Sequence, residues 1–205
     1  MQPGSWTGPG AYLMLPAMAK KLQESAPRQT MILKAAEDLF YERSFAAVGV
    51  DEIGQRAGVT GPAIYRHFRG KDEILSTLFN DAIDRLMEAT AGSEDDPLKQ
   101  LEALARGHAE SVLSERKLAG VKIREERSLA APFRRGLHRR ERRYIERWLD
   151  CVGRCYPERD RAELTTATHV ALGALNSVAT WSAEAVKGED TADIVAHRGG
   201  VSEHW

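Results

Sequence analysis

A short stretch of the chain, residues 61–71, carries side chains that bind nucleic-acid phosphates. It contains Arg66, Arg69 and Lys71 and no acidic residue. The whole chain is nearly balanced, with 29 basic and 30 acidic residues and a formal net charge of −1, so a basic surface can arise only locally. Basic side chains bind nucleic acids by releasing the counterions of the phosphates. The local imbalance therefore predicts contact with a polyanion such as DNA.

Other side chains with catalytic or metal-binding chemistry form no recognisable motif. The sequence has no glycine-rich phosphate loop, no nucleophile motif and no paired carboxylates with a credible site. Cys151 and Cys155 lie four residues apart, on one face of a helix, but no histidine or carboxylate cluster accompanies them. Free cysteines are usually core residues. We therefore expect no catalytic residue, no metal and no cofactor.

Helical periodicity places the basic stretch at the end of three helices. The first is predicted at residues 28–43, with one apolar face. A short second helix follows Gly49, and Gly58 suits the left-handed conformation that ends it. Thr60 precedes the third helix, and Pro62 lies in its first turn, where no intrahelical donor is lost. Two short helices joined by so tight a turn form a helix-turn-helix.

The third helix, predicted at residues 61–68, divides into two faces. Ile64 and Phe68 lie four residues apart and are expected to face the core. The positions left outside are Ala63, Tyr65, Arg66 and His67. This outer face is the surface that would meet DNA.

Between residues 32 and 75, residues of particular types stand at fixed distances from one another along the sequence. They are Ala35-Ala36 with Leu39-Phe40, Phe45, Val50-Asp51-Glu52-Ile53, Ala57-Gly58-Val59-Thr60, Ile64-Tyr65-Arg66-His67-Phe68 and Lys71-Asp72-Glu73-Ile74-Leu75. This pattern resembles the DNA-binding domain of TetR-family transcriptional regulators. The order of the later helices also suits the all-helical ligand-binding and dimerisation domain of that family.

The resemblance implies a role for each position of the outer face. Ala63 and Arg66 would approach base edges in the major groove. Tyr65, His67 and Lys71 would bind phosphates. Because Lys71 opens a helix, the helix N-terminus would attract the same phosphate.

The helix starts and the arm ahead of the first helix complete the implied DNA-binding surface. Gly49 would offer its backbone N–H to a phosphate, and Thr60 would both cap its helix and contact the DNA. Gly61 stands where the family often has a lysine, so one basic contact is absent there. Pro62 lies beside Gly61. Arg28, on a flexible arm ahead of the first helix, is expected to compensate for the missing basic contact.

The second half of the chain is expected to hold an effector pocket. His108 and His169 each have two readings, as a polar anchor in an apolar pocket or as a hydrogen-bonded core histidine. Trp148 either walls the pocket or fills the core. The candidate pocket residues are Leu104, His108, Val112, Trp148, Val152, His169 and Leu172.

Two further segments suggest binding surfaces. The helix predicted from about residue 158 to 187 has small side chains that would let a second helix approach, and in the resembling family this helix contributes to the dimer interface. The chain beyond Gly188 is short and broken by glycine, so a long final helix is not evident. Residues 134–147 contain seven arginines and two glutamates. This run is either a solvated helix face with glutamate partners at helical spacing, or a site for a polyanion such as DNA or the phosphates of an acyl-CoA.

We therefore predict an all-α protein. Residues 1–24 are expected to be a disordered leader, 25–72 a helix-turn-helix DNA-binding domain, 73–198 a helical effector-binding and dimerisation domain, and 199–205 a tail. The chain has no apolar run of membrane length and only two cysteines, which indicates a cytoplasmic protein without membrane contact.

The predicted function is a homodimeric repressor on a near-palindromic operator in double-stranded DNA. A small-molecule effector, hydrophobic or acyl-CoA-like, would release it. The alternatives are a helical adaptor that binds only protein, and an enzyme with an unrecognised site.

Overall fold

The computed structural model describes residues 11–181, with side chains from residue 27 onward. Within them the chain is helical, and no strand occurs, which confirms the predicted all-α class. The helices are α1 (Ala11–Glu42), α2 (Val50–Arg56), α3 (Gly61–Ile64), α4 (Lys71–Ala89), α5 (Pro97–Ser114), α6 (Arg116–Glu125), α7 (Ala131–Cys155) and α8 (Arg161–Ser177), with 3-10 turns at Glu126–Ser128 and Val178–Thr180.

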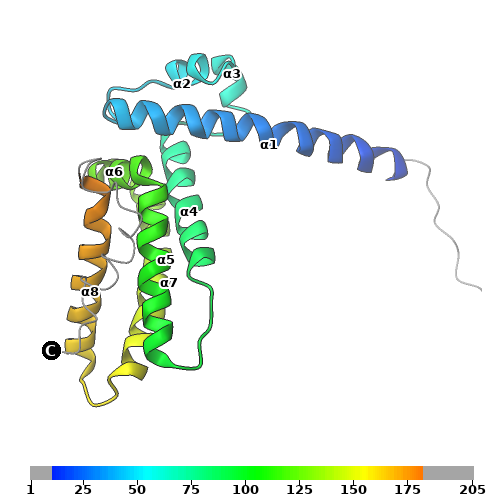
Figure 1. Ribbon diagram of the computed structural model, residues 1–205. Helices are drawn as coiled ribbons and strands as arrows, with labels where there is room; N and C mark the ends of the chain where they lie inside the picture. The colour runs from blue at the N-terminus through cyan, green and yellow to red at the C-terminus, as the bar shows by residue number, and fades with distance from the viewer. Residues whose placement is uncertain (1–10, 182–205) are drawn as a thin grey trace, which may run out of the picture.

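A small unit formed by the C-terminal half of α1 together with α2 and α3 lies on top of a longer bundle (Figure 1). We call it the reading unit. The helix α4 runs from this unit down into the bundle of α5, α7 and α8. The short helix α6 lies across the top of the bundle, beneath α1 (Figure 1). None of the described helices combines the length and apolar character needed to span a membrane.

Two hydrophobic cores hold these parts together. The upper core joins α1 to α4 and includes Leu118 and Val121 from α6 and Leu137 from α7. The lower core lies among α5, α7 and α8 and includes Trp148 and Leu172. The upper core thus continues from the reading unit into α6 and α7, so α6 packs directly against the reading unit.

The helix α1 begins earlier than the sequence pattern indicated. The prediction of a disordered leader through residue 24 is wrong for residues 11–24, which lie in α1. Residues 17–24 are mostly strong helix formers, and the prediction gave more weight to the glycines and prolines before them. Arg28 is consequently an exposed helical residue and not part of a flexible arm. Residues 1–10, the part of the predicted effector domain beyond residue 181 and the tail at 199–205 lie outside the described residues.

The helices α4 and α5 cross closely near the end of α4. A Cβ atom at Gly107 would lie 2.7 Å from the carbonyl oxygen of Ala89, so only glycine allows this approach. The start of α5 is fixed separately by Asp96, whose side chain accepts a hydrogen bond from the Leu98 N–H at 2.9 Å. The close approach at Gly107 therefore packs α5 against α4, the helix that enters the reading unit.

Candidate functional site

The helix-turn-helix has the geometry that its glycines predicted. Gly58 has a φ of 68°, which confirms the left-handed turn after α2. The Val59 N–H then donates to the Gly54 carbonyl at 2.9 Å. A Cβ at Gly61 would collide with the Asp51 carboxylate. Asp51 from α2 thus occupies the space beside Gly61, where the family often has a lysine side chain.

The recognition helix is shorter than predicted. It ends at Ile64 rather than at residue 68, and the chain continues as a tight turn in which the His67 and Phe68 N–H groups both donate to the Ile64 carbonyl, at 2.8 and 2.9 Å. Such tightening is common where a short helix ends. Ile64 and Phe68 are buried, as predicted, and Tyr65 is 59% exposed.

The outer face carries cations that the protein does not neutralise. Within the described residues, the guanidinium groups of Arg66 and Arg69 contact no acceptor, and both side chains are exposed. Ala63 and His67 lie beside them, partly exposed. An unpaired basic surface around a helix-turn-helix is what phosphate binding requires.

The starts of α2 and α3 lie where the sequence predicted them, but the predicted side-chain cap of α3 is absent. Gly49 precedes α2 and Thr60 precedes α3, both in extended backbone conformation, and Pro62 lies in the first turn of α3. The Thr60 side chain makes no capping hydrogen bond, so the prediction that its hydroxyl caps the helix is wrong. Its exposed hydroxyl is directed to no acceptor within the described residues.

Lys71 is engaged inside the protein. Its ammonium group donates to the carbonyl oxygens of Phe45 at 2.8 Å, Val48 at 3.2 Å and Ala46 at 3.4 Å. It also lies 4.5 Å from the centroid of the Phe45 ring. Three donors thus meet three acceptors, and the geometry favours a structural role in tying α4 to the turn after α1 over the predicted phosphate contact.

A cavity of about 400 Å³ lies between α4, α5, α6, α7 and α8. Its volume falls in the range of small-molecule sites. The structure places four predicted pocket residues in its wall, namely His108, Val112, His169 and Leu172. Most other wall residues are apolar, among them Phe79, Ala82, Ile83, Leu86, Leu118, Ala119 and Ile145.

The other three predicted pocket residues lie in the lower core. Leu104, Trp148 and Val152 are buried there and do not line the cavity. The Trp148 ring makes an edge contact with His108, with centroids 6.0 Å apart. Trp148 therefore supports the wall of the cavity from behind.

A chain of polar side chains, with His108 and Tyr144 buried and Asn176 exposed, forms part of the cavity wall. His108 Nδ1 lies 2.8 Å from the Tyr144 hydroxyl, and His108 Nε2 lies 3.3 Å from Asn176 Oδ1. Burial lowers the pKa of His108 from 6.5 to about 4 and raises the pKa of Tyr144 from 10.0 to about 12. Both groups are therefore uncharged at neutral pH. The sequence did not indicate Tyr144 or Asn176, because their partners come from different helices.

Charged side chains form another part of the cavity wall. Lys122 Nζ lies 2.6 Å from Glu141 and 2.8 Å from Glu126, and His138 Nε2 lies 2.7 Å from Glu126. Burial alone would lower the pKa of Lys122, but Glu141 and Glu126 outweigh it and raise that pKa. In the described part of the chain, Glu126, His138 and Glu141 have the side-chain types and spacing of metal ligands. The Lys122 ammonium already compensates both carboxylates, so a metal ion would have to displace it.

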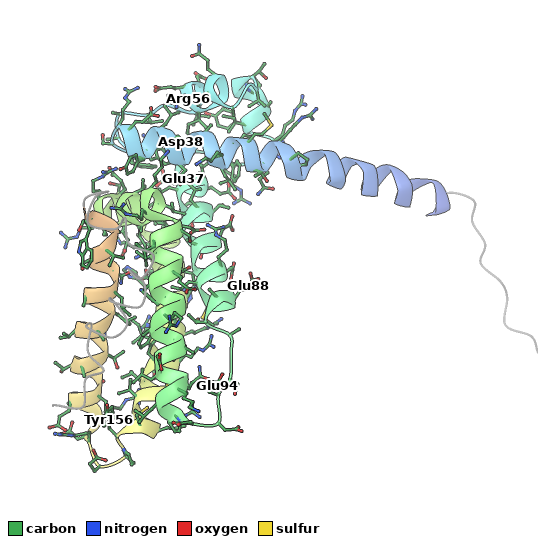
Figure 2. All side chains as sticks on the ribbon, in the orientation of Figure 1. Glu37, Asp38, Arg56, Glu88, Glu94 and Tyr156 are labelled. Atoms are coloured by element: carbon green, nitrogen blue, oxygen red, sulfur yellow. The ribbon has the colours of Figure 1, made fainter. Side chains whose placement is uncertain are left out.

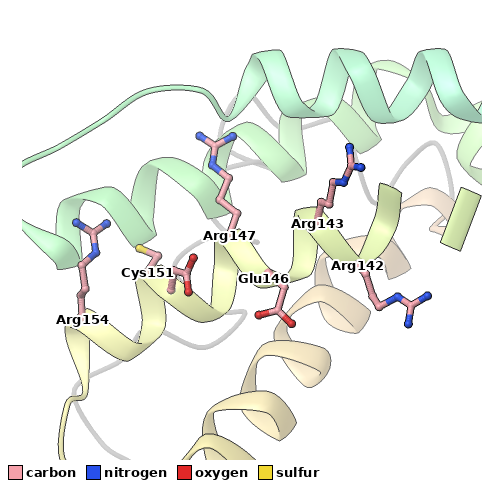
Figure 3. Close-up of a pocket in the computed structure, with 7 residues that line it drawn as sticks. Arg142, Arg143, Glu146, Arg147, Cys151 and Arg154 are labelled. Atoms are coloured by element: carbon pink, nitrogen blue, oxygen red, sulfur yellow. The ribbon is translucent and has the colours of Figure 1, made fainter. Parts of the chain in front are cut away.

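The arginines of the α7 run do not line the cavity. Tyr144 and Ile145 line the cavity, whereas Arg142 and Arg143 are exposed on the other side of the helix. Figure 3 shows the guanidinium groups here spread along α7 without converging on one point. These arginines line a shallow depression together with Glu146, Arg147, Asp150, Cys151 and Arg154.

The partners of this run differ from the predicted ones. Its two glutamates pair outside the run, Glu141 with Lys122 and Glu146 with Arg161 at 2.7 Å. Arg140 instead pairs with Asp84 of α4. The expectation of glutamate partners at helical spacing within the run is therefore wrong, although the face is solvated.

Comparison with known families agrees with this architecture. Residues 32–78 match a family model described as bacterial regulatory proteins, tetR family. Residues 94–198 match a second model, described as tetracyclin repressor-like, C-terminal domain. A helix-turn-helix followed by this helical domain defines a class of DNA-binding transcriptional regulators. The chain belongs to the TetR family of that class.

Individual relatives match over part of the chain. The chain is 38% identical over 60 residues to the transcriptional activator FasR of Mycolicibacterium smegmatis, which covers 29% of this chain and 27% of FasR. It is 35% identical over 86 residues to the transcriptional regulator TtgR of Pseudomonas putida, covering 40% of this chain and 41% of TtgR. The matched segments thus span less than half of either relative.

A solved structure matches over most of the chain. AibR, crystallised in complex with isovaleryl coenzyme A and operator DNA, superposes with a TM-score of 0.71. The match covers 83% of this chain and 95% of AibR, at 19% sequence identity. This similarity confirms the shared fold.

Proposed function

We propose that this chain is a dimeric repressor that binds a near-palindromic operator and leaves it when a small hydrophobic effector enters the cavity. The observation that carries the proposal is the position of α6. One side of this helix lines the cavity, and the other side holds the reading unit. An effector that favours one position of α6 must therefore change the affinity for DNA.

The contacts between α6 and α1 are specific. Lys117 Nζ lies 3.0 Å from Asp38, which is labelled on α1 in Figure 2. Arg124 donates to the carbonyl oxygens of Phe40 at 3.3 Å and Tyr41 at 3.1 Å. On the cavity side, α6 contributes Leu118, Ala119 and Lys122. A displacement of α6 by a ligand therefore moves the end of α1.

A second route runs through α4 and α7. The Ala130 N–H, just before α7, donates to the Asp72 carboxylate at the start of α4 at 3.0 Å. The middle of α4 contributes Phe79 and Ile83 to the cavity wall. Both α4 and α7 thus touch the cavity and end at the reading unit, which supports coupling between the two sites.

An exposed stripe on α8 supports dimerisation. Thr166, Ala167, Val170, Gly173 and Ala174 are exposed and follow helical spacing, and Val170 is 65% exposed. Small side chains let a second helix approach closely. We infer that α8 pairs with its copy in a partner subunit, which sets the spacing of two recognition helices on successive major grooves.

The position of the arginine run favours a hydrophobic effector over an acyl-CoA. The acyl chain of such a ligand could enter the cavity, but the exposed arginines on the far side of α7 could not then bind its phosphates. We assign the protein no catalytic role and place its action in the cytoplasm, where operator DNA lies.

DNA binding by the purified full-length protein tests the proposal. Fluorescence anisotropy with its own upstream DNA at several salt concentrations should give tight binding that weakens steeply with salt. Tyr65→Ala should abolish this binding. Tyr156→Ala should not, because Tyr156 lies at the opposite end of the bundle (Figure 2).

Two results would count against the proposal. Equal binding of the Tyr65→Ala variant would place the DNA contact elsewhere on the protein. If the wild-type protein also selects no sequence from a random oligonucleotide pool, sequence-specific DNA binding is refuted, and a helical adaptor that binds only protein becomes the better interpretation.

A further inference from the structure

Every charged side chain in the cavity wall already has a partner within the protein. Glu115 accepts hydrogen bonds from Arg85, one of them at 3.0 Å. Lys122 and Glu141 form an ion pair with each other, and Glu126 supplies Lys122 with a second carboxylate. An ionised ligand would therefore enter an apolar cavity without meeting an unpaired counter-charge from residues 27–181, which is strongly unfavourable.

His108 adds no charge to the cavity wall at neutral pH. His108 is 2% exposed and stays neutral because burial lowers its pKa to about 4. His169 lies at the exposed edge of the cavity, and its Nδ1 is hydrogen-bonded to the Thr165 carbonyl at 2.8 Å.

The direction of these hydrogen bonds leaves one donor of the cavity wall without an acceptor among the described residues. Asn176 Oδ1 can only accept a hydrogen bond, so the proton of the neutral His108 imidazole is on Nε2, which donates to it. His108 Nδ1 is then an acceptor, and the Tyr144 hydroxyl donates to it. The Asn176 carboxamide oxygen is thereby occupied. Its NH₂ group belongs to an exposed side chain of the cavity wall, contacts no acceptor in the described part of the chain and is available to a ligand.

We propose that the cavity selects uncharged, mainly apolar effectors and binds a hydrogen-bond acceptor on them, such as a carbonyl oxygen, through the amide NH₂ of Asn176. His108 and Tyr144 are positioning residues that hold this amide with its oxygen turned away from the ligand. The inference rests on the proposed function, in which this cavity is the effector site.

A matched series of ten-carbon probes tests the inference on the full-length protein. The probes are 2-decanone, 1-decene, decanoate and decylammonium, which share a chain and differ in the head group. Their dissociation constants are measured by isothermal titration calorimetry, and their effect on DNA affinity is measured by fluorescence anisotropy. We expect 2-decanone to bind about fivefold more tightly than 1-decene, as one net hydrogen bond implies. Both ions should bind at least tenfold more weakly than 2-decanone.

Two variants separate the Asn176 contact from general polarity. Asn176→Leu keeps a similar side-chain shape and should remove the preference for 2-decanone over 1-decene. Ser111→Ala removes a different polar group of the wall and should leave that preference intact. In both variants, unchanged DNA binding without a probe shows that the fold is preserved.

The possible outcomes distinguish the inference from the proposed function. Tighter binding of decanoate or decylammonium than of 2-decanone would overturn the selection for neutral ligands. An unchanged ketone preference in Asn176→Leu would overturn the role of Asn176. In either case the cavity would still be an effector site. If no probe binds to protein that still binds DNA, the effector half of the proposed function fails, and this inference fails with it.

Discussion

Replacing Lys71 with methionine is expected to destabilise the reading unit while leaving its phosphate contacts in place. Methionine keeps an unbranched side chain of similar length but removes the ammonium group. That group donates to the Phe45 carbonyl at 2.8 Å and the Val48 carbonyl at 3.2 Å, and it lies 4.5 Å from the centroid of the Phe45 ring. Its loss leaves the carbonyl oxygens to partial solvation.

The magnitude follows from these contacts. A hydrogen bond with a charged group contributes about 1.5–3 kcal/mol, and a cation–π contact at an exposed site adds about 0.5–1 kcal/mol. Because one partly exposed ammonium makes all of these contacts, we expect the free energy of unfolding to fall by about 2 kcal/mol in total. For a chain of this size, that corresponds to a decrease in Tm of about 4–8 °C.

Thermal unfolding and salt-dependent DNA binding together decide the role of Lys71. In Lys71→Met the Tm should fall, and the slope of log K against log salt concentration should stay unchanged at temperatures well below the Tm. The control Arg66→Met should show the reverse, because the Arg66 guanidinium is exposed and has no partner among the described residues. An unchanged Tm in Lys71→Met, with a slope smaller by about 0.9 per lost phosphate contact, would refute the structural role and restore the phosphate contact.

Three further predictions concern the bundle and its coupling to the reading unit. As the pH falls below 6.5, His108 in the unfolded chain binds a proton, whereas in the folded protein it stays neutral down to about pH 4, so the free energy of unfolding should decrease over this range by up to about 3 kcal/mol. In urea unfolding measured at several pH values, His108→Gln should make this decrease smaller. An equal decrease in both proteins would contradict the assignment to His108. Gly107→Ala should lower the free energy of unfolding by about 1–3 kcal/mol because its Cβ meets the Ala89 carbonyl. The control Gly153→Ala, where a Cβ makes only an ordinary contact at 3.8 Å, should stabilise α7 by about 0.5–1 kcal/mol, and equal destabilisation would remove the argument from close approach. Arg124→Met should preserve DNA binding and effector binding measured separately but reduce the factor by which the effector weakens DNA binding, and full coupling in this variant would exclude Arg124 from the route between the two sites.

The parts of the fold that were predictable from the sequence are those set by neighbouring residues. Gly58 adopts the predicted left-handed conformation, and Pro62 lies in the predicted first turn of a helix. Ile64 and Phe68 are buried as their spacing indicated. In each case the outcome depends on local sterics or on the helical period, and both can be read directly from the chain.

The wall of the cavity was only partly predictable, because periodicity shows which side of a helix is buried and not what fills the space beside it. His108 and Leu172 line the cavity. Trp148 and Val152 lie on equally apolar faces but pack into the lower core. The difference depends on how closely neighbouring helices approach, which is decided by the packing of all the side chains between them.

The sequence by itself determined the helical class, the helix-turn-helix and its exposed basic surface, because helical period, turn glycines and local charge are properties of neighbouring residues. Only the tertiary structure decided which polar groups are available to a ligand. Lys71 is occupied by carbonyl groups 23 to 26 residues earlier in the chain, and the Asn176 amide is oriented by His108 from another helix. Hydrogen-bond partners so distant in sequence leave no periodic signal, because they meet only when the helices pack.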